Sequence, residues 1–575
     1  AVTDALGQVV RTAYDAVGNV VAEDGATYPV RYGYDTAERR TSLATTRDGA
    51  TGDVMRWSCD AATGLCTEKT YADGSTVVYT HTPDGLPLRT TCASGRWTEN
   101  VYDSKRQSVG RLSSDGSDDA ALVRDAFGRL VASSNRNSTV TRTLADNGTA
   151  TNEAWTVGGE SATLVRELDA QGRLAALAGR GGALVRALDA QGRLAALAGR
   201  DGAPSPSAPS PAYAQRYAYG ADGRLAAVSN AEAVVTYAYA PDGRDAGYTL
   251  TLANGTTFAR SVVRDSFRRD LVARIENRVN GTPVESLAYA YDALARPVTR
   301  NGDAFGYNTR GEVVSSHGGT KSTEESYAYD GIGNAVLAAS GGVTNAYAAN
   351  ALNQYASILR ASVSPCETIP QYDADGNLTG CGPWAFSYDA ANRLVTVSSN
   401  GVLLVTNFYD AQSRRVRKAT PEATTTYIYD GWNLVDERIA YANGTTSMIH
   451  YYWGKDISGT FQGAGNAPVA KRSGCLSEAN PKGRKGSRIG GLLYFTVNDT
   501  PYVPFYDNNG NVTHYCDASG SVAAMYTYDA FGKTVAPSGP LADLFRHRFS
   551  TKCLDAETGL YYYGYRFYAP SLMRW

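Results

Sequence analysis

The sequence is poor in the residues and runs that mark several common classes of protein. It has only 4 Met and 5 His among its 575 residues. No stretch approaches the roughly 20 consecutive apolar residues that a membrane-spanning helix needs. The 55 basic residues nearly balance the 57 acidic ones, so the composition gives no sign of steering toward nucleic acid. We therefore expect neither a membrane span nor a nucleic-acid partner.

Motifs that carry chemistry are also missing. No two histidines have the i, i+4 or HExxH spacing of a zinc enzyme; they are His81, His317, His450, His514 and His547. There is no GxSxG elbow, Walker loop or dinucleotide fingerprint. The segments at 373–377 (DADGN) and 507–511 (DNNGN) begin like a calcium loop but lack its bidentate Glu. We expect no catalytic residue, no metal site and no cofactor.

The cysteines do not form a recognisable framework. No pair has the CxxC spacing of a zinc site; the eight are Cys59, Cys66, Cys92, Cys366, Cys381, Cys475, Cys516 and Cys553. Cys59 and Cys66 flank DAATGL and could face each other across a hairpin. Scattered small core residues are the favoured alternative, because disulfide frameworks mark small domains.

Tyrosine and glycine are abundant, with 39 Tyr against 13 Phe and 7 Trp, and 59 Gly. Tyr, Val and Thr favour half-buried pleated surfaces, while Gly and Asp favour turns. The composition therefore predicts an all-β protein made of many short strands and tight turns.

One sequence unit recurs from end to end: aromatic–x–Tyr–Asp–x–x–Gly–Arg/Asn–apolar–apolar. Neighbouring copies lie about 16 to 21 residues apart. We expect the repeat to be carried by Tyr14, Asp15, Gly18, Tyr217, Tyr219, Gly223, Tyr329, Asp330, Gly333, Tyr372, Asp373, Gly376, Tyr506, Asp507, Gly510, Tyr528, Asp529 and Gly532. A repeat of this length is the mark of a stacked architecture.

Each part of the unit has a mechanical reason. Tyr-x-Tyr puts two rings on one face of a strand. The Asp carboxylate accepts from a backbone N–H two residues on, and Gly takes the positive φ that a bulged turn requires. Each unit is thus expected to be a β-hairpin that is stable only when stacked on its neighbours. Strand twist would curve the resulting antiparallel sheet into a spiral, partly hollow shell.

Some copies depart from the pattern. Glu38 and Ala295 stand where Gly is expected, and Pro297 removes one ladder donor. Residues 164–180 and 184–200 differ at a single position, and we expect two tandem hairpins there. The Pro/Ser-rich stretch 204–212 is expected to loop out of the sheet.

The unit resembles the YD repeat of Rhs proteins, of the C component of insecticidal Tc toxins, and of teneurins. Residues 545–575 resemble the Rhs-repeat-associated core, with Cys553 and Ala569 as mild departures. The resemblance assigns the core motif to Asp555, Glu557, Thr558, Gly559, Leu560, Tyr561, Tyr562, Tyr563, Gly564, Arg566, Tyr568, Pro570, Leu572, Arg574 and Trp575.

The resemblance implies a β-cocoon whose end is sealed by the core and which holds a toxic C-terminal segment. In that family a DPxG-type element after the core cuts the chain. Those aspartates have no matching position up to Trp575, so none is assigned and the chain is not expected to be an enzyme. The first residues already lie inside a repeat, and Trp575 stops in mid-motif. We therefore expect a fragment truncated at both ends.

Three regions follow from this pattern. Residues 1–462 are expected to form the repeat wall, and 492–575 the last repeats with the core. Between them, 463–491 breaks the repeat with six basic residues against Glu478 alone; they are Lys471, Arg472, Lys482, Arg484, Lys485 and Arg488. A solvated insertion loop is the favoured interpretation of this segment, with an anionic contact as the alternative.

The favoured function is a structural shell that encloses and presents a C-terminal effector of the same parent chain. The parent is expected to be secreted or displayed at the cell surface, with a secretion-system or cell-surface partner. The alternative is a surface adhesin whose Tyr-rich face binds carbohydrate or another cell. A DPxG element and a polymorphic segment after Trp575 would favour the shell, and a wall anchor there would favour adhesion.

Overall fold

The computed structural model describes residues 1–47, 52–171, 173–180, 187–188, 194–196, 213–268, 270–319, 324–361, 366–456 and 489–575. Within these ranges the chain is almost wholly antiparallel β-strand, and the one helical element is a 3-10 turn, η1 (Phe549–Thr551). The all-β prediction is confirmed. The 204–212 loop and residues 463–488 of the basic insertion lie outside the described residues. In the part described, no helix is long and apolar enough to cross a bilayer.

Each strand of the wall pairs with the next strand along the chain. The run from β1 (Val2–Thr3) to β34 (Cys366–Thr368) forms a 32-stranded sheet. The run from β35 (Gln371–Tyr372) to β48 (Thr534–Ser538) forms a 14-stranded sheet. The long antiparallel wall expected from the repeat is thus divided at one point into two sheets. Pro370 lies at the break and has no N–H to donate to a ladder.

The tandem copies differ in where they sit. The first forms a hairpin of β16 (Glu160–Leu168) and β17 (Leu174–Arg180) inside the wall. β17 then pairs directly with β20 (Tyr213–Tyr219). The second copy supplies β18 (Ala187–Leu188) and β19 (Leu194–Ala196), which pair with each other in a separate two-stranded sheet. The second hairpin is thus excluded from the wall.

The repeat turn has a recurring hydrogen-bond pattern, seen in the hairpin of β2 (Val9–Tyr14) and β3 (Val20–Gly25). The Asp15 carboxylate accepts from the backbone N–H of Val17 at 3.1 Å and of Asn19 at 2.8 Å. Its other oxygen accepts from the Asn19 side chain at 3.1 Å. Gly18 has φ +98°, which an L side chain rarely adopts. The Asp carboxylate thus closes the turn, and the side chain of the Asn or Arg after the Gly donates a further hydrogen bond to that carboxylate.

The motif Tyr links each hairpin to the preceding one by a hydrogen bond. Its hydroxyl donates to the backbone carbonyl that begins the preceding return strand. Tyr34 donates to Val20 at 2.8 Å, and Tyr506 to Leu492 at 2.6 Å. The same bond is made by Tyr102, Tyr239, Tyr291, Tyr329, Tyr409, Tyr429 and Tyr528. A Phe could supply the ring but not this donor, which accounts for the excess of Tyr.

Replacing Ala295 with glycine should stabilise the wall. Ala295 stands at the Gly position of its turn with φ +65°, where a Cβ costs about 1 kcal/mol. The midpoint of thermal unfolding should rise for Ala295→Gly. The reverse change, Gly333→Ala, should lower it, because φ is +89° and an added Cβ would lie 2.8 Å from the Tyr28 ring. A lower midpoint for Ala295→Gly would contradict this account of the degenerate turns.

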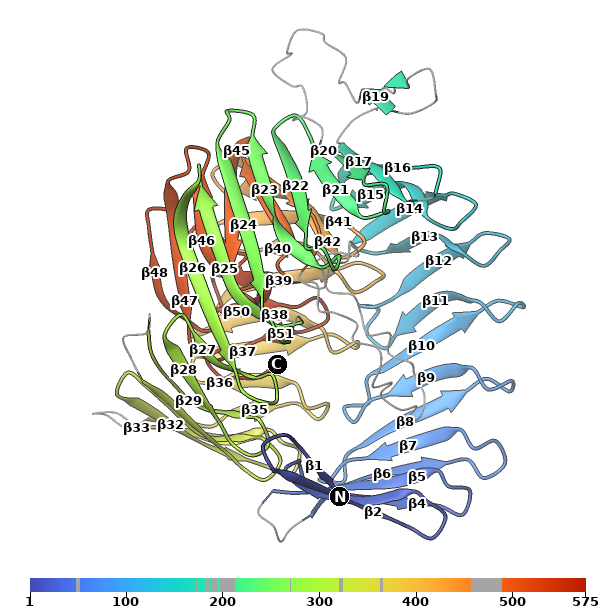
Figure 1. Cartoon of the computed structure of the whole chain (residues 1–575). Coiled ribbons are helices and arrows are strands. Elements are labelled where there is room, and N and C mark those ends of the chain that lie inside the picture. Colours follow the sequence, from blue (N-terminus) through green and yellow to red (C-terminus); the bar gives the residue numbers. More distant parts are fainter. Residues whose placement is uncertain are drawn as a thin grey trace.

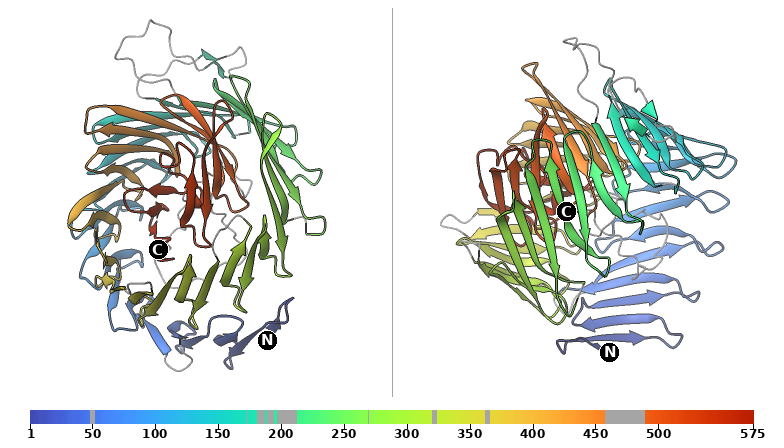
Figure 2. Two further views of the ribbon diagram at one scale, coloured as in Figure 1. Left: turned by 90° about the vertical axis from the view of Figure 1, so that its left-hand side faces the viewer. Right: turned by 45° about the horizontal axis from the view of Figure 1, so that its top comes forward.

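The wall winds so that later hairpins lie against earlier ones (Figures 1 and 2). Contacts across this seam join residues 205 to 302 positions apart, from Glu325–Ala530 to Arg47–Ala349. Since neighbouring hairpins bury little surface by themselves, the seam supplies a second set of neighbours for each of them. The C-terminal strands lie inside the winding wall (Figure 2, left).

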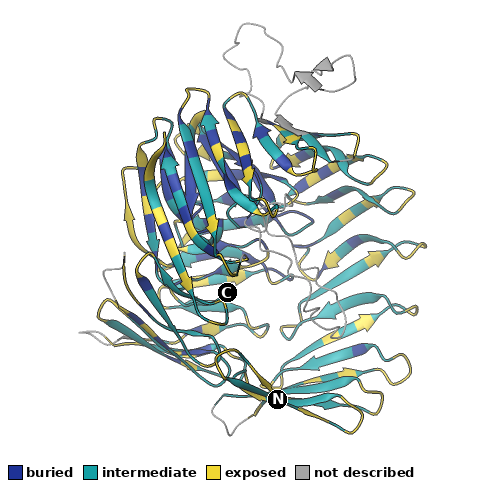
Figure 3. Cartoon of the chain, viewed as in Figure 1, coloured by how far each residue is buried: buried dark blue, intermediate teal, exposed yellow. Residues whose placement is uncertain are grey.

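The buried core is not spread evenly along the wall. Its largest cluster runs from Val140 through Phe258 to Phe545 and includes Tyr427, Tyr494 and Tyr515. The first strands, β2 to β10 (Trp97–Tyr102), are mostly of intermediate exposure (Figure 3). The core therefore forms where inner C-terminal strands pack against the wall.

Candidate functional site

Two kinds of turn alternate along the wall, and they meet at the seam. A YD turn is the Asp-x-x-Gly turn of the repeat, and a return turn is the connection from one repeat to the next. Arg96, at a return turn, donates to the Asp373 carboxylate at 2.6 Å and to the Tyr388 carbonyl at 2.8 Å. Asn135 and Asn137, at another return turn, each donate to the Tyr409 carbonyl at 2.8 Å. Return-turn side chains therefore donate to YD-turn oxygens of the next winding.

The YD turn also donates across the seam. The N–H of the residue after its Asp is not used within the turn. In the Asp330 turn, Gly331 N–H donates to the Arg47 carbonyl at 2.9 Å. In the Asp389 turn, Ala390 N–H donates to the Asp115 carboxylate at 3.1 Å. The Asp529 turn makes the same bond from Ala530 to Glu325 at 3.2 Å.

The expected repeat residues fall into two groups. The turns that contain Asp330, Asp373, Asp507 and Asp529 lie in the seam. The turn of Tyr14, Asp15 and Gly18 lies on the outer edge of the first winding, where nothing approaches a Cβ built on Gly18. The Tyr217–Gly223 turn lies on the same edge; Tyr219 donates to the Leu174 carbonyl there at 2.9 Å. The remaining members, Tyr329, Gly333, Tyr372, Gly376, Tyr506, Gly510, Tyr528 and Gly532, flank the seam turns.

The C-terminal segment 545–575 is tied to the wall by a buried group of charges. Asp555, at the end of β49 (Cys553–Asp555), binds both terminal nitrogens of Arg415 at 2.5 and 3.0 Å. Lys418 lies 3.3 Å from Asp555 and 3.0 Å from Glu557. Burial opposes the ionised carboxylate, but the two cations outweigh burial and hold the pKa of Asp555 well below its usual range. Arg415 and Lys418 come from β40 (Arg415–Ala419) of the wall.

The rest of the core motif packs as a ring cluster. Strand β50 (Leu560–Tyr562) links β49 to β51 (Phe567–Tyr568). Trp575 packs on Tyr563 at 4.5 Å and on Tyr568 at 5.2 Å, and Arg566 lies over the Trp575 ring. Arg574 reaches the wall, where it donates to the Asn334 side chain at 2.6 Å and stacks on Tyr355. Thr558, Gly559, Tyr561, Gly564 and Pro570 lie in the turns and strands between these contacts.

Three other buried side chains near this segment, His547, Cys553 and Cys516, are held uncharged. Burial and the nearby Lys552 and Arg546 lower the pKa of His547 to about 3. Burial, with Asp555 and Glu437 nearby, raises the pKa of the Cys553 thiol to about 12. Burial raises the pKa of Cys516 to about 12 as well. A thiol is a poor nucleophile in that state, so this arrangement favours packing over chemistry.

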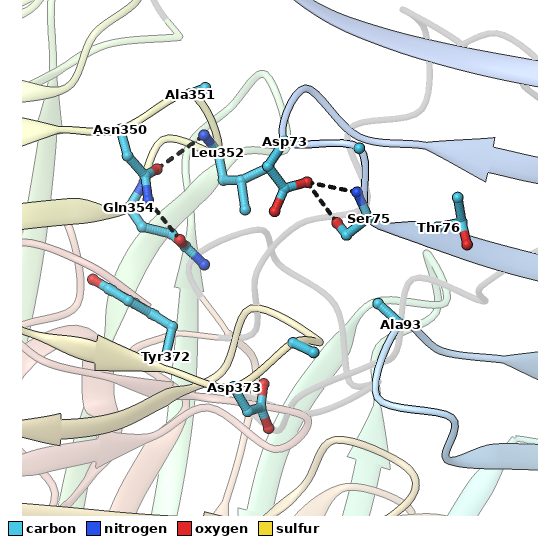
Figure 4. Close-up of a pocket in the computed structure, with 12 residues that line it drawn as sticks. Asp73, Ser75, Thr76, Ala93, Asn350, Ala351, Leu352, Gln354, Tyr372 and Asp373 are labelled. Atoms are coloured by element: carbon cyan, nitrogen blue, oxygen red, sulfur yellow. Dashed lines mark hydrogen bonds between the residues drawn. The ribbon is translucent and has the colours of Figure 1, made fainter.

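Potential ligand sites are few in the described part of the chain. No group of three or more His, Cys, Asp or Glu there could hold a metal ion. A cleft of about 540 Å³ opens at the seam beside the break between the two large sheets (Figure 4). Asp73, Asn350, Gln354, Tyr372 and Asp373 line it. Asp73 accepts from Ser75, and Asn350 from Leu352, so these polar groups serve their own turns.

Cys59 and Cys66 lie directly opposite each other on neighbouring strands.

Sequence reasoning missed the wall side of the buried charge group. Arg415 and Lys418 lie on the return strand that follows the Asp410 turn. Arg415 stands where the repeat has an apolar residue, and it is 1% exposed. A cation in an apolar position of the repeat was the available signal, because such a group needs a buried partner.

Comparison with known proteins places the fold. No family model matches the chain. The tRNA3(Ser)-specific nuclease WapA of Bacillus spizizenii is 29% identical over 256 residues, 42% of this chain and 9% of that protein. Double-stranded DNA deaminase toxin A of Burkholderia cenocepacia is 24% identical over 307 residues, 50% of this chain and 20% of that protein. The chain thus spans a small part of the curated relatives that it matches.

Among solved structures, TcdB2-TccC3 without its hypervariable C-terminal region has a TM-score of 0.65 at 13% identity. The match covers 99% of this chain and 32% of that one. The complex TcdB2-TccC3-Cdc42 has a TM-score of 0.60 at 14% identity. The wound β-wall predicted from the repeat is therefore confirmed as a fold shared with TcdB2-TccC3.

Proposed function

We propose that this chain is a structural wall of a polymorphic toxin, which encloses and presents a C-terminal effector of the same polypeptide. The observation that carries the proposal is the C-terminal segment, which lies inside the winding wall and is clamped there by buried ion pairs (Figure 2, left). A polypeptide that continues from Trp575 starts on the inner side of the wall. The wall then acts by steric sequestration, and no residue of it performs chemistry.

Two features support the container over the adhesin. The motif tyrosines donate to wall carbonyls, so their hydroxyls are engaged within the wall. The similar proteins are named as nucleases and toxins, and each is much longer than the matched region. The proposal also places the parent protein outside the cell or at its surface, with the effector as its main partner.

The test uses one protease-sensitive epitope placed either after Trp575 or before Ala1. The inner position should be cleaved at least about tenfold more slowly under native conditions, because cleavage there requires the wall or the C-terminal segment to open. Asp555→Asn should shorten the delay by loosening the clamp. Equal cleavage at both positions in the unmodified wall would rule out sequestration.

A further inference from the structure

Two cysteines replace a recurring pair of the repeat in one hairpin of the first winding. In the hairpin of β2 and β3, the motif Tyr14 lies directly opposite Val20, the first residue of the return strand. The hairpin of β6 (Gly52–Cys59) and β7 (Cys66–Thr70) has a cysteine at both of these positions (Figure 1). A cysteine lacks the ring and the phenol hydroxyl with which the motif Tyr links neighbouring hairpins. This hairpin therefore departs from the repeat at both members of one pair.

The strand register brings the two cysteines together at the end of the hairpin. Asp60 N–H donates to the Leu65 carbonyl at 2.8 Å, so these two residues form the hydrogen-bonded pair that closes the turn. Hydrogen-bonded and non-hydrogen-bonded pairs alternate along an antiparallel ladder, so Cys59 and Cys66 form a non-hydrogen-bonded pair. The Cα atoms of such a pair lie about 4.5 Å apart, and its side chains share one face. Because a disulfide joins Cα atoms about 4.4–6.8 Å apart, the backbone of this pair suits one.

No other cysteine in the described strand registers lies opposite a cysteine. The other registers pair Cys366 with Arg360, Cys381 with Trp384, Cys516 with Val503 and Val522, and Cys553 with Tyr562. Cys516 and Cys553 are buried, as expected of small core residues. Cys59 is only half-buried at the end of its strand. Core packing therefore accounts for Cys516 and Cys553, but not for a facing pair at a hairpin end.

The pair lies where a covalent cross-link would have a structural effect. Strands β2 to β10 are mostly of intermediate exposure, so the hairpins of this region bury little apolar surface. A bond between residues 59 and 66 would restrict the unfolded hairpin and fix the register of its two strands. The Cys66 thiol donates to the Glu68 carbonyl at 3.6 Å. A thiol is a weak donor, so little is lost when a disulfide replaces this contact.

We propose that Cys59 and Cys66 are a modification site: they form an intramolecular disulfide that holds the β6–β7 hairpin when the wall meets a disulfide oxidant such as oxidised glutathione. The thiolate of Cys59, the more exposed of the two, attacks the oxidant and expels one thiolate from it. The Cys66 thiolate then attacks the Cys59 sulfur of the mixed disulfide and expels the second. The two cysteines lose two protons and two electrons, and the oxidant becomes two thiols.

The place where this bond forms rests on the proposed function, since disulfides persist in secreted proteins and at cell surfaces. The capacity to form it rests only on the register of β6 and β7. The bond would thus be absent while the parent protein is still inside the cell and would form after export.

The test places residues 1–575 in a buffer of equal reduced and oxidised glutathione and then alkylates the remaining thiols. Trypsin releases both cysteines in one peptide, residues 57–69, because it cleaves after Arg56 and Lys69. We expect this peptide to lack two hydrogen atoms and to carry no alkyl group. Cys66→Val is the matched control, since it places the Val of the β2–β3 hairpin at this position. In that variant Cys59 should carry one glutathione or one alkyl group.

Hydrogen exchange then measures what the bond does for the hairpin. Amides of β6 and β7 should exchange at least about tenfold more slowly in the oxidised protein than in the reduced protein. Amides of the β2–β3 hairpin, which has no cysteine, should exchange equally in both forms. In Cys66→Val, the exchange of β6 and β7 should not depend on the oxidant.

Two alkyl groups or two glutathiones on the 57–69 peptide would overturn the proposal, and so would a disulfide from this peptide to a second chain. A bond that forms but leaves the exchange of β6 and β7 unchanged would overturn its role in holding the hairpin. None of these results bears on whether the wall sequesters a segment after Trp575. The epitope experiment and the oxidation experiment can therefore fail independently.

Discussion

Replacing Asp555 with asparagine should release the C-terminal segment from the wall. The change keeps the shape of the side chain but removes the charge that compensates Arg415 and Lys418, both 1% exposed. Breaking a buried ion pair from one side typically costs about 3–5 kcal/mol, because the remaining charge stays buried without compensation. The free energy of opening of residues 545–575 should fall by about that amount.

Native-state hydrogen exchange is the suitable measurement, since a long repeat wall need not unfold in a single step. Amides of β49 and β50 should exchange about two to four orders of magnitude faster in Asp555→Asn. Glu557→Gln is the matched control, because its side chain is 25% exposed and pairs only with Lys418. Its effect should stay below about 1 kcal/mol. Unchanged exchange in Asp555→Asn would show that the charges do not hold the segment.

Local structure could be predicted from sequence because each repeat turn is closed by its own residues. Asp15 binds the N–H groups of Val17 and Asn19 within five residues of chain. Nothing distant is needed to form such a turn, so its Asp and Gly are visible as a pattern. The stacking of hairpins follows from the same pattern, because a single hairpin cannot bury enough surface.

The seam could not be predicted in the same way. Arg96 and Asp373 are 277 residues apart, and which hairpins meet depends on a twist summed over many strands. A small change in twist per strand would move every contact by a whole hairpin. The break at Pro370 and the exclusion of β18 and β19 also alter the winding. In the sequence, Arg415 could be recognised only as an exception to the repeat. Its pairing with Asp555 could be seen only in the folded structure.

Acidification should weaken the docking of the C-terminal segment through His547. The imidazole is 6% exposed, packs edge-on against Tyr451 at 4.8 Å and lies near Lys552 and Arg546. These surroundings lower its pKa to about 3 in the folded state, against about 6.5 in an unfolded chain. Between these two values the unfolded state binds one proton more than the folded state. The stability contributed by neutral His547 is therefore complete above about pH 6.5 and falls by roughly 1.4 kcal/mol for each pH unit below it.

The difference between wild type and His547→Gln isolates this effect from the titration of other groups. Hydrogen exchange at pH 7, 6 and 5 measures the free energy of opening of residues 545–575, which should decrease as the pH falls. In the wild type this decrease should be steeper than in His547→Gln by about one proton. His317→Gln, at an exposed position near the end of β29 (Val313–Gly318), should leave the wild-type slope unchanged. Parallel slopes for wild type and His547→Gln would mean that His547 is not the group that couples protonation to opening. A steeper slope in the wild type would show that acid weakens the docking of residues 545–575 through His547. Asp555, whose pKa is lowered, is still ionised at these pH values. Both contributions are lost on acidification, but in different pH ranges: that of His547 from about pH 6.5 downward, and that of Asp555 only below the usual pKa of an aspartate.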